Sequence, residues 1–276
     1  VVADLPWGPI DTVTEVTSSA EFFAKFAPTP LVDLLTYSAT FPALKAFINK
    51  TWPNSLKIVR ISPATQAAAT KVFNDSGAAA SVVVTARYPG LVGNTIKVAW
   101  SVNALDATAR DATVTIGTSY SAVYKAVATI VATVLTVTDP GDPYVAFTKS
   151  GAATLVPIAI AATALATGLD GTAAAGDYTS AITSFSDASV KWNVGFVAEP
   201  PSALCDAINA GLKSFEDTYH IGMWVLCTVA NQSVATAKTY AATYASDRLV
   251  YPWPLVKTLN AYDPNRAEIT VSGNSF

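Results

Sequence analysis

The sequence predicts an α/β protein (α+β overall), with a helix-covered, largely parallel sheet as a core domain and an antiparallel β-rich domain inserted into it. Two observations carry this prediction. Towards both ends of the 276-residue chain, apolar strands alternate with helical stretches, as in parallel sheets covered by helices. Between them, residues 78–167 form short runs rich in Val, Thr, Ala and Ser, separated by Gly, Pro and Asp turns, as in antiparallel sheets.

The core domain is expected over residues 1–77 and 168–276. Its first strand is TVTEV, residues 12–16. Ser18 and Glu21 then have the spacing of a capping box, which predicts the start of a short helix. That helix carries three aromatic residues on its inner side, Phe22, Phe23 and Phe26.

The rest of the first part continues the alternation of helix and strand. A helical stretch is expected over 31–50, with Pro42 as the first residue of a new helix. The apolar run LKIVRI, residues 56–61, predicts a strand. A helix beginning at Pro63 is expected over 63–73.

The inserted domain is expected over residues 78–167, where only nine of the 90 residues are charged. Five runs predict its strands: ASVVVTARY, NTIKVAWSV, ATVTIG, ATVLTVT and PYVAFTKS. In residues 119–131 the apolar positions also fit a spacing of three and four, so a helix is expected there.

The core domain resumes after the turn GLDG at 168–171. Its second part predicts strands over 192–200, 221–230 and 248–256. Between them, the sequence predicts a helix over 201–220, with Leu204, Ile208 and Leu212 on one stripe, and a helix over 233–246, started by Ser233.

Charge is low throughout the chain. Charged residues make up 13% of it, hydrophobic residues 51%, and the net charge is −3. A subunit that hides surface against neighbours would show this balance; small Ala, Thr and Val residues that inflate the hydropathy are the alternative. No Lys/Arg cluster is present, which argues against direct nucleic-acid binding. The most apolar run, residues 155–167, is too short to span a membrane and contains Pro157, so we expect no membrane insertion.

The carboxyl ends of the predicted parallel strands, where such sheets usually bind ligands, offer no phosphate loop. The turns read AEPPSA, TVANQS and YPWP, without the glycines that let backbone amides surround a phosphate. The motifs GxxxxGK[ST] and GxGxxG occur nowhere. We therefore expect no nucleotide and no other cofactor.

Nucleophilic catalysis is not indicated either. His220, the single histidine, ends a predicted helix, and a C-terminal cap role explains it better than a general-base role. Ser202 follows two prolines as a helix-capping residue, and no GxSxG elbow is present. Cys205, in the first turn of a helix, and Cys227, in an apolar strand, have no basic neighbour, so both are expected to be small buried hydrophobes.

Four carboxylates remain as candidates: Asp170, Asp177, Glu199 and Asp206. Paired acids can perform acid–base catalysis. The Gly-Leu-Asp-Gly setting of Asp170 instead favours a turn, and Asp206 suits the first turn of a helix. Acids do not alternate as a calcium loop requires, and one His with two separated Cys does not support a zinc site. The sequence thus predicts no catalytic, cofactor-binding or metal-binding residue, and no enzyme.

The stretch ARYPGLVGNTIKV, residues 86–98, concentrates turn-forming residues between two strands. No predicted helix follows Gly93, which excludes a phosphate cradle, and its apex has no nucleophile. We interpret it as a corner where the chain leaves the core domain for the insert. Pro89 and Gly90 would form one turn, and Gly93 and Asn94 would adopt positive φ at the next.

Four segments in order resemble the tail sheath family of contractile phage tails and related injection systems. The segment at 7–27, WGPIDTVTEVTSSAEFFAKFA, resembles the family's opening strand and Ser-x-x-Glu-Phe helix, and LKIVRIS at 56–62 resembles its Val-Arg-Val strand. The family's A-x-x-Pro-Gly-x-x-Gly-Asn-x-Ile-x-Val stretch is matched at Ala86, Pro89, Gly90, Gly93, Asn94, Ile96 and Val98. Finally, LATGLDGTAAAGDYTSAI at 165–182, followed by VGFVAEP and RLVYPWP, resembles its Gly-Gly-x-Asp-Gly turn and core strands, with Thr167 in place of the first glycine.

The resemblance implies a structural subunit that stacks as rings into a helical tube around an inner tail tube and shortens on triggering, without catalysis or cofactor. Its implied partners are copies of itself, the inner tail tube protein, and the baseplate and tail terminator proteins. Its implied location is the virion, assembled in the host cytoplasm, with the insert facing outward. The family usually continues beyond the equivalent of Phe276 with a C-terminal α/β domain that carries an arm.

Two alternatives come from other classes. A surface-exposed, adhesin-like binding module on an α/β carrier would also have an uncharged β domain. A hydrolase with a displaced site would depend on His220. The six tryptophans, Trp7, Trp52, Trp100, Trp192, Trp224 and Trp253, lie in or beside predicted strands and turns, which is more typical of core and interface packing than of a stacking platform.

Overall fold

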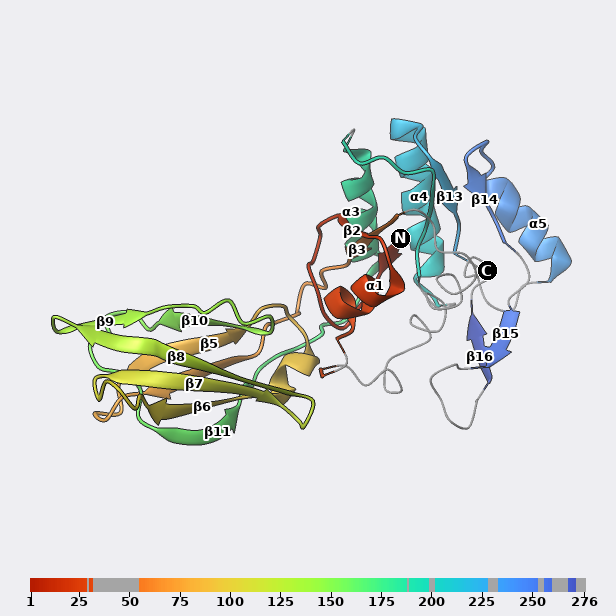
Figure 1. Ribbon diagram of the computed structural model, residues 1–276. Coiled ribbons are helices and arrows are strands. Elements are labelled where there is room, and N and C mark those ends of the chain that lie inside the picture. The colour runs from red at the N-terminus through yellow and green to blue at the C-terminus, as the bar shows by residue number, and fades with distance from the viewer. Residues whose placement is uncertain are drawn as a thin grey trace. The chain divides into compact units, whose positions relative to one another are not determined.

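The computed structural model describes residues 1–28, 30–31, 55–187, 189–198, 202–227, 233–252, 256–259 and 268–271. Over these residues the protein is a mixed α+β fold with four α-helices and several sheets, whose strand pairs are mostly antiparallel (Figure 1). The chain forms two compact units. The core unit comprises Val1–Ala27, Asp33–Ala64 and Thr172–Phe276, and the β unit comprises Pro28–Val32 and Thr65–Gly171.

The core unit contains all four described α-helices. Its first elements are β1 (Val2–Ala3), β2 (Thr14–Val16), α1 (Ser19–Phe26) and β3 (Leu56–Arg60). After the β unit follow α3 (Ala175–Thr183), the 3₁₀ turn η2 (Ser184–Ser186), β12 (Val194–Phe196), α4 (Cys205–Tyr219), β13 (Met223–Val225), α5 (Val234–Thr243), β14 (Leu249–Val250), β15 (Val256–Leu259) and β16 (Glu268–Val271). The helices expected over 31–50 lie outside the described residues.

All parallel strand pairs of the described chain belong to the core unit. β1 pairs in parallel with β3, while β2 pairs antiparallel with the other edge of β3. A second sheet has the order β12–β13–β14 with both pairs parallel. Just beyond β12, Val197 forms a parallel bridge with Val2, and the Ala198 N–H donates to the Val2 carbonyl over 2.8 Å.

One buried cluster joins these strands to α3 and α4. Helix α4 contributes Cys205, Ile208, Leu212 and Phe215, which recur every three or four positions and so form one apolar stripe. The other members lie in or just after β1, β3, α3, η2, β12 and β13: Val2, Val59, Ile61, Tyr178, Ala181, Ile182, Phe185, Val197, Trp224, Leu226 and Cys227. The predicted stripe is confirmed for Ile208 and Leu212, and Leu204, the N-cap residue, packs against the cluster from its edge.

Local capping signals locate two helix starts correctly. The Ser18 hydroxyl accepts from the Glu21 N–H at the start of α1, and the Ser233 hydroxyl accepts from the Thr236 N–H at the start of α5. Glu21 does not close the box on Ser18 but accepts from the Thr17 N–H over 2.7 Å. Phe22 and Phe26 are buried as expected, whereas Phe23 is partly exposed.

The β unit consists of eight strands and one 3₁₀ helix. They are β4 (Thr70–Asn74), β5 (Ala80–Ala86), η1 (Leu91–Thr95), β6 (Ile96–Val102), β7 (Ala109–Ile116), β8 (Tyr120–Val131), β9 (Val134–Val137), β10 (Val145–Lys149) and β11 (Ile160–Ala164). Every named strand pair in it is antiparallel, in two sheets with the orders β10–β5–β4 and β11–β6–β7–β8–β9.

The two sheets of the β unit pack face to face around Trp100. Its ring, on β6 of the five-stranded sheet, lies 5.8 Å from the rings of Phe73 on β4 and Phe147 on β10. All three side chains are at most 3% exposed. The alternating apolar runs of the sequence therefore form a sandwich whose inner faces meet at this aromatic layer.

The helix expected over 63–73 is wrong. Residues Thr70–Asn74 form β4, which pairs with β5 and so belongs to the β unit. The main segment of the β unit therefore runs from Thr65, whereas the insert is expected from residue 78. The alanine-rich run has helix propensity, but strand pairing and the β-branched Thr70 and Val72 prevail.

The helix expected over 119–131 is also wrong, because these residues form β8. A bulge interrupts its pairing with β7, and Ala126 there adopts a φ of +50°. Ala112 pairs with Tyr124 and Arg110 with Ala128, so three residues of β8 lie opposite Asp111 alone. The bulge interrupts the alternation of side chains along β8, which is why the apolar positions of this strand also fit a spacing of three and four.

Candidate functional site

His220 occupies the C-cap of α4, as the sequence predicts. Its backbone is left-handed, with φ +50°, and its N–H donates to the Glu216 carbonyl over 2.9 Å. The imidazole Nδ1 lies 3.5 Å from Glu216 Oε1, and the side chain is largely exposed. The residue therefore ends a helix and faces solvent.

Both cysteines are buried, and neither forms a disulfide. Cys205 begins α4, and Cys227 lies two residues beyond β13 rather than within a strand. Asn209, fully buried on α4, pairs with the Cys227 backbone: its Oδ1 accepts from the Cys227 N–H over 2.7 Å, and its Nδ2 donates to the Cys227 carbonyl over 2.9 Å. Asn209 is not among the residues predicted from the sequence, although its position between Ile208 and Leu212 marks the buried side of the helix.

The candidate carboxylates have separate structural roles. Asp170 accepts from the Leu91 N–H over 2.7 Å, and Asp177 accepts from the Ala174 N–H over 2.8 Å at the start of α3. Asp206 lies in the first turn of α4, and Glu199 lies outside the described residues. Asp170 belongs to the β unit, whereas Asp177 and Asp206 belong to the core unit. Within the described ranges, no group of three His, Cys, Asp or Glu side chains is arranged to hold a metal ion.

The Pro-Gly-x-x-Gly-Asn stretch packs directly on the Gly-Leu-Asp-Gly turn. The Asn94 side chain forms a reciprocal pair with Gly168, donating to its carbonyl over 3.0 Å and accepting from its N–H over 2.8 Å. A Cβ on Gly168 would lie 2.5 Å from the Gly90 carbonyl oxygen, so only glycine allows this approach. Two motifs that lie 74 residues apart thus form one corner.

This corner differs from the prediction in two ways. Gly90 does adopt a positive φ, +137°, but Gly93 and Asn94 lie in η1. Gly93 is required for close packing rather than for its φ, because a Cβ there would lie only 3.0 Å from the Ala69 Cβ. The corner joins β5 to β6 within the β unit, so it does not mark the exit from the core domain. Its side-chain and backbone groups bond to one another, which makes it structural.

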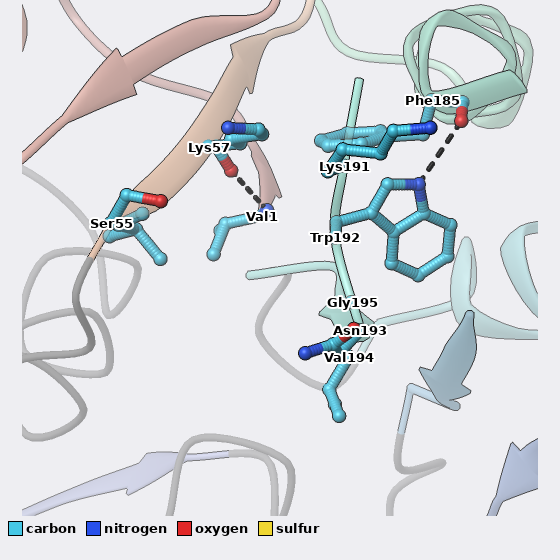
Figure 2. A pocket seen from close by; sticks show the side chains of 10 residues that line it. Val1, Ser55, Lys57, Phe185, Lys191, Trp192, Asn193, Val194 and Gly195 are labelled. Carbon is cyan, nitrogen blue, oxygen red and sulfur yellow. Dashed lines mark hydrogen bonds between the residues drawn. The ribbon is translucent and has the colours of Figure 1, made fainter. Parts of the chain in front are cut away.

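A cavity of about 400 Å³ lies in the core unit, at the amino ends of β3 and β12. Figure 2 shows Ser55 and Lys57 entering it from β3, and Lys191 to Gly195 from the segment that leads into β12. The Trp192 indole N–H donates to the Phe185 carbonyl over 3.1 Å, and Lys57 Nζ forms an ion pair with Glu15 over 2.9 Å.

The floor of this cavity is aromatic. Trp192 lies 5.0 Å from Trp224 and 5.7 Å from Phe185, measured between ring centroids. A Cβ on Gly195 would lie 2.6 Å from the Trp224 ring, so this glycine lets the buried indole pack against β12. The polar side chains of the described lining are those of Ser55, Lys57, Lys191 and Asn193.

This cavity is not predicted from the sequence. Its walls come from segments more than 120 residues apart, Ser55–Lys57 and Lys191–Gly195. The available signal was Gly195, because an isolated glycine in an apolar strand often marks a close backbone approach.

Comparison with solved structures shows which proteins share the fold of this chain. A sheath tail protein from Desulfitobacterium hafniense superposes with a TM-score of 0.61 over 99% of this chain, at 16% sequence identity. The chain has the fold of sheath tail proteins. The sheath tail protein Lin1278 from Listeria innocua gives a TM-score of 0.60, again over 99% of this chain, at 18% identity. This chain spans 56% and 53% of the lengths of these two proteins.

Both units lie within the matched region, since each match covers 99% of this chain. No protein-family model and no curated protein matches the sequence. At identities of 16% and 18% it is the fold, rather than particular side chains, that is shared. In the part of the chain that the structure describes, no helix combines the length and apolarity needed to cross a bilayer.

Proposed function

We propose that this chain is a structural subunit of a contractile tail sheath. Copies polymerise as stacked rings into a helical tube around an inner tail tube, and contraction of that tube drives delivery of a genome or effector. The observation that carries this proposal is the sheath tail fold, shared with two solved sheath tail proteins over 99% of the chain.

The roles of individual residues support a structural rather than an enzymatic function. Among the described candidates, His220 caps a helix, the cysteines and Asn209 stabilise the core, and Asp170 stabilises a corner. The low charge, 13% of all residues, suits a subunit that buries surface against its neighbours.

The proposed partners are copies of the same chain, the inner tail tube protein, and the baseplate and tail terminator proteins. The proposed location is a phage tail in the virion, after assembly in the host cytoplasm. Neither nucleic acid nor membrane is a proposed direct partner, because basic clusters are absent from the sequence.

A finer description of the fold belongs to the same proposal. The parallel bridge between Val2 and Val197 supports one continuous, largely parallel sheet covered by α3 and α4 as the sheath core. The expected insert at residues 78–167, extended by β4, would then be an outward-facing elaboration of the domain formed by 1–77 and 168–276.

The test is electron microscopy of the protein expressed together with the inner tail tube protein from the same source. We expect helical tubes that enclose the inner tube and that shorten and widen when treated with denaturant below the unfolding midpoint. Particles no larger than single subunits, at every protein and salt concentration tested, would contradict the proposal.

A further inference from the structure

The cavity at the amino ends of β3 and β12 has two walls that come from distant parts of the chain. Figure 2 shows Ser55 and Lys57 on one side, and Trp192, Asn193 and Val194 on the other. All described residues of its lining belong to the core unit. Its volume of about 400 Å³ falls within the range of about 300–1,000 Å³ that is usual for small-molecule sites. The cavity therefore has room for a small ligand or for one large side chain of a partner.

Trp192 gives the cavity an aromatic surface that is held in place. Its indole N–H donates to the Phe185 carbonyl over 3.1 Å, and its ring centroid lies 5.0 Å from that of Trp224. A Cβ on Gly222 would lie 2.2 Å from the Trp192 ring, so the indole packs directly on this part of the backbone. Trp192 remains partly exposed. A ring that is already fixed loses little entropy when an apolar or aromatic group packs on it.

The polar side chains of the described lining can all donate hydrogen bonds. They are those of Ser55, Lys57, Lys191 and Asn193. The side chain of Lys57 is only 16% exposed, whereas Lys191 and Asn193 are exposed at the rim. Donors that converge beside an aromatic surface favour a ligand that has an apolar body and acceptor oxygens.

The charges around the cavity suit a ligand with one negative charge. Glu15 pairs with Lys57 over 2.9 Å and so offsets the charge of this lysine. The Val1 amine donates to the Lys57 carbonyl over 2.6 Å, and burial lowers its pKa to about 5, so it is mostly neutral at pH 7. Lys191 adds a positive charge at the rim. A group with two negative charges would keep one of them poorly paired, which is costly away from water, so a carboxylate fits better than a phosphate.

We propose that this cavity binds a carboxylate that is joined to an apolar, preferably aromatic, group. The apolar group packs on Trp192, and the carboxylate accepts hydrogen bonds from Lys191 and from the neighbouring donors. Such a ligand is either a free aryl carboxylate or an acidic residue beside an aromatic one in a polypeptide. Binding of this kind goes beyond the proposed function and requires no assembled tube.

The test is a titration of the isotope-labelled protein with phenylacetate, followed by NMR of the tryptophan indole N–H groups. The chain has six tryptophans, and Trp192→Phe identifies the signal of Trp192 by its loss. We expect that signal to move with a dissociation constant on the order of 1 mM, as for a ligand of about ten non-hydrogen atoms. Phenylacetamide has the same size without the charge and should bind roughly tenfold more weakly.

Two pairs of variants locate the site. Lys191→Gln removes a cation from the described lining, and Lys238→Gln removes an exposed cation of α5 that lies outside it. Val194→Glu and Val234→Glu add a negative charge at positions that are 59% and 56% exposed, and of these two only Val194 belongs to the lining. We expect Lys191→Gln and Val194→Glu each to weaken phenylacetate binding by roughly tenfold, and the two controls to leave it unchanged. Unchanged circular dichroism spectra verify that the variants fold.

A second ligand separates the two sources of the carboxylate. The dipeptide acetyl-Glu-Phe-amide carries its carboxylate on a side chain next to an aromatic ring. Binding of this dipeptide at least roughly tenfold tighter than that of phenylacetate would assign the site to a segment of a polypeptide partner. Equal or weaker binding would assign it to a free carboxylate.

Three results would overturn the site. They are equal affinity for phenylacetate and phenylacetamide, equal affinity in Lys191→Gln and Lys238→Gln, and a Trp192 signal that does not move at about 20 mM phenylacetate. None of them bears on the formation of tubes, so the sheath function and the carboxylate site stand or fall separately.

Discussion

Two buried carboxylates, Asp111 and Asp142, organise the polar interior of the β unit. Asp142 is fully buried and accepts from the Tyr120 and Tyr124 hydroxyls and from the Tyr144 and Val145 N–H groups, over 2.8 to 3.0 Å. Burial raises the pKa of Tyr120, and so do its hydrogen bonds to Tyr124 and Asp142. With these hydrogen bonds formed, the buried Asp142 side chain has a structural role: it stabilises the loop that leads into β10.

Asp111 fixes the bulge in β8. It accepts from Lys125 Nζ over 2.8 Å, from the Ala126 N–H over 2.9 Å and from Asn103 Nδ2 over 2.7 Å. Burial alone would raise the pKa of Asp111, but these hydrogen bonds outweigh it and lower the pKa below its usual value. The carboxylate therefore takes the place of the strand partner that the bulged residue lacks.

Replacing Asp111 with alanine should destabilise the β unit by about 1–3 kcal/mol, because the partly buried Ala126 N–H and Asn103 amide lose their acceptor. The control is Asp139→Ala, which removes the same carboxylate from the partly exposed ion pair with Arg87 and should cost less than about 1 kcal/mol. Urea unfolding measures both losses. Equal losses would show that Asp111 does not hold the bulge.

At the scale of elements, close packing of strands decides where glycine is required. In β12, Gly195 gives the ring of Trp224 its space, and Trp224 is itself only 1% exposed, so the ring cannot move aside. The aromatic floor of the cavity therefore depends on a residue without a side chain.

Gly195→Ala should cost about 1–3 kcal/mol, because its Cβ would overlap a buried ring. Gly176→Ala in α3 is the control in the same unit: a Cβ there has no neighbour within 4 Å, and alanine favours the helix by about 0.5–1 kcal/mol. Thermal unfolding followed by tryptophan fluorescence measures both. A Gly195→Ala protein as stable as the unchanged chain would contradict the packing described above.

Sequence predicted the elements whose signals are local. Ser18 and Ser233 start α1 and α5, and the apolar run at 56–61 contains β3, because caps and continuous burial are visible in a few neighbouring residues. It failed at β4, where pairing with β5 prevails over helix propensity, and at β8, where a bulge held by Asp111 disturbs the alternation of side chains. The cavity was missed because its walls are far apart in the sequence and meet only after folding.

At the scale of the whole molecule, the low charge bears on how copies of this chain would interact in the proposed sheath. With 13% charged residues and a net charge of −3, such contacts would depend on apolar burial more than on ion pairs. Exposed apolar side chains such as Leu105 and Val131 are one possible source of such burial in the proposed sheath.

Self-association should therefore respond little to simple salt. Raising the ionic strength from about 0.01 M to about 1 M shortens the screening length from roughly 30 Å to roughly 3 Å. Over this range of sodium chloride we expect the association constant to change less than about tenfold, whereas sulfate should strengthen it through exclusion from apolar surface. A steep loss with sodium chloride, measured by light scattering, would indicate association through ion pairs instead.

The β unit begins and ends on paired strands. Ala67 bridges Leu169, and Thr70 bridges Ala166, both antiparallel, so the incoming and outgoing chain run side by side at its base. A polypeptide inserted at this point needs only adjacent ends to be accommodated, whatever its length or fold. The same geometry would let recombination exchange the β unit for another domain. A reporter domain with neighbouring termini could likewise replace residues 71–165 without separating the two chain segments that flank the replaced part.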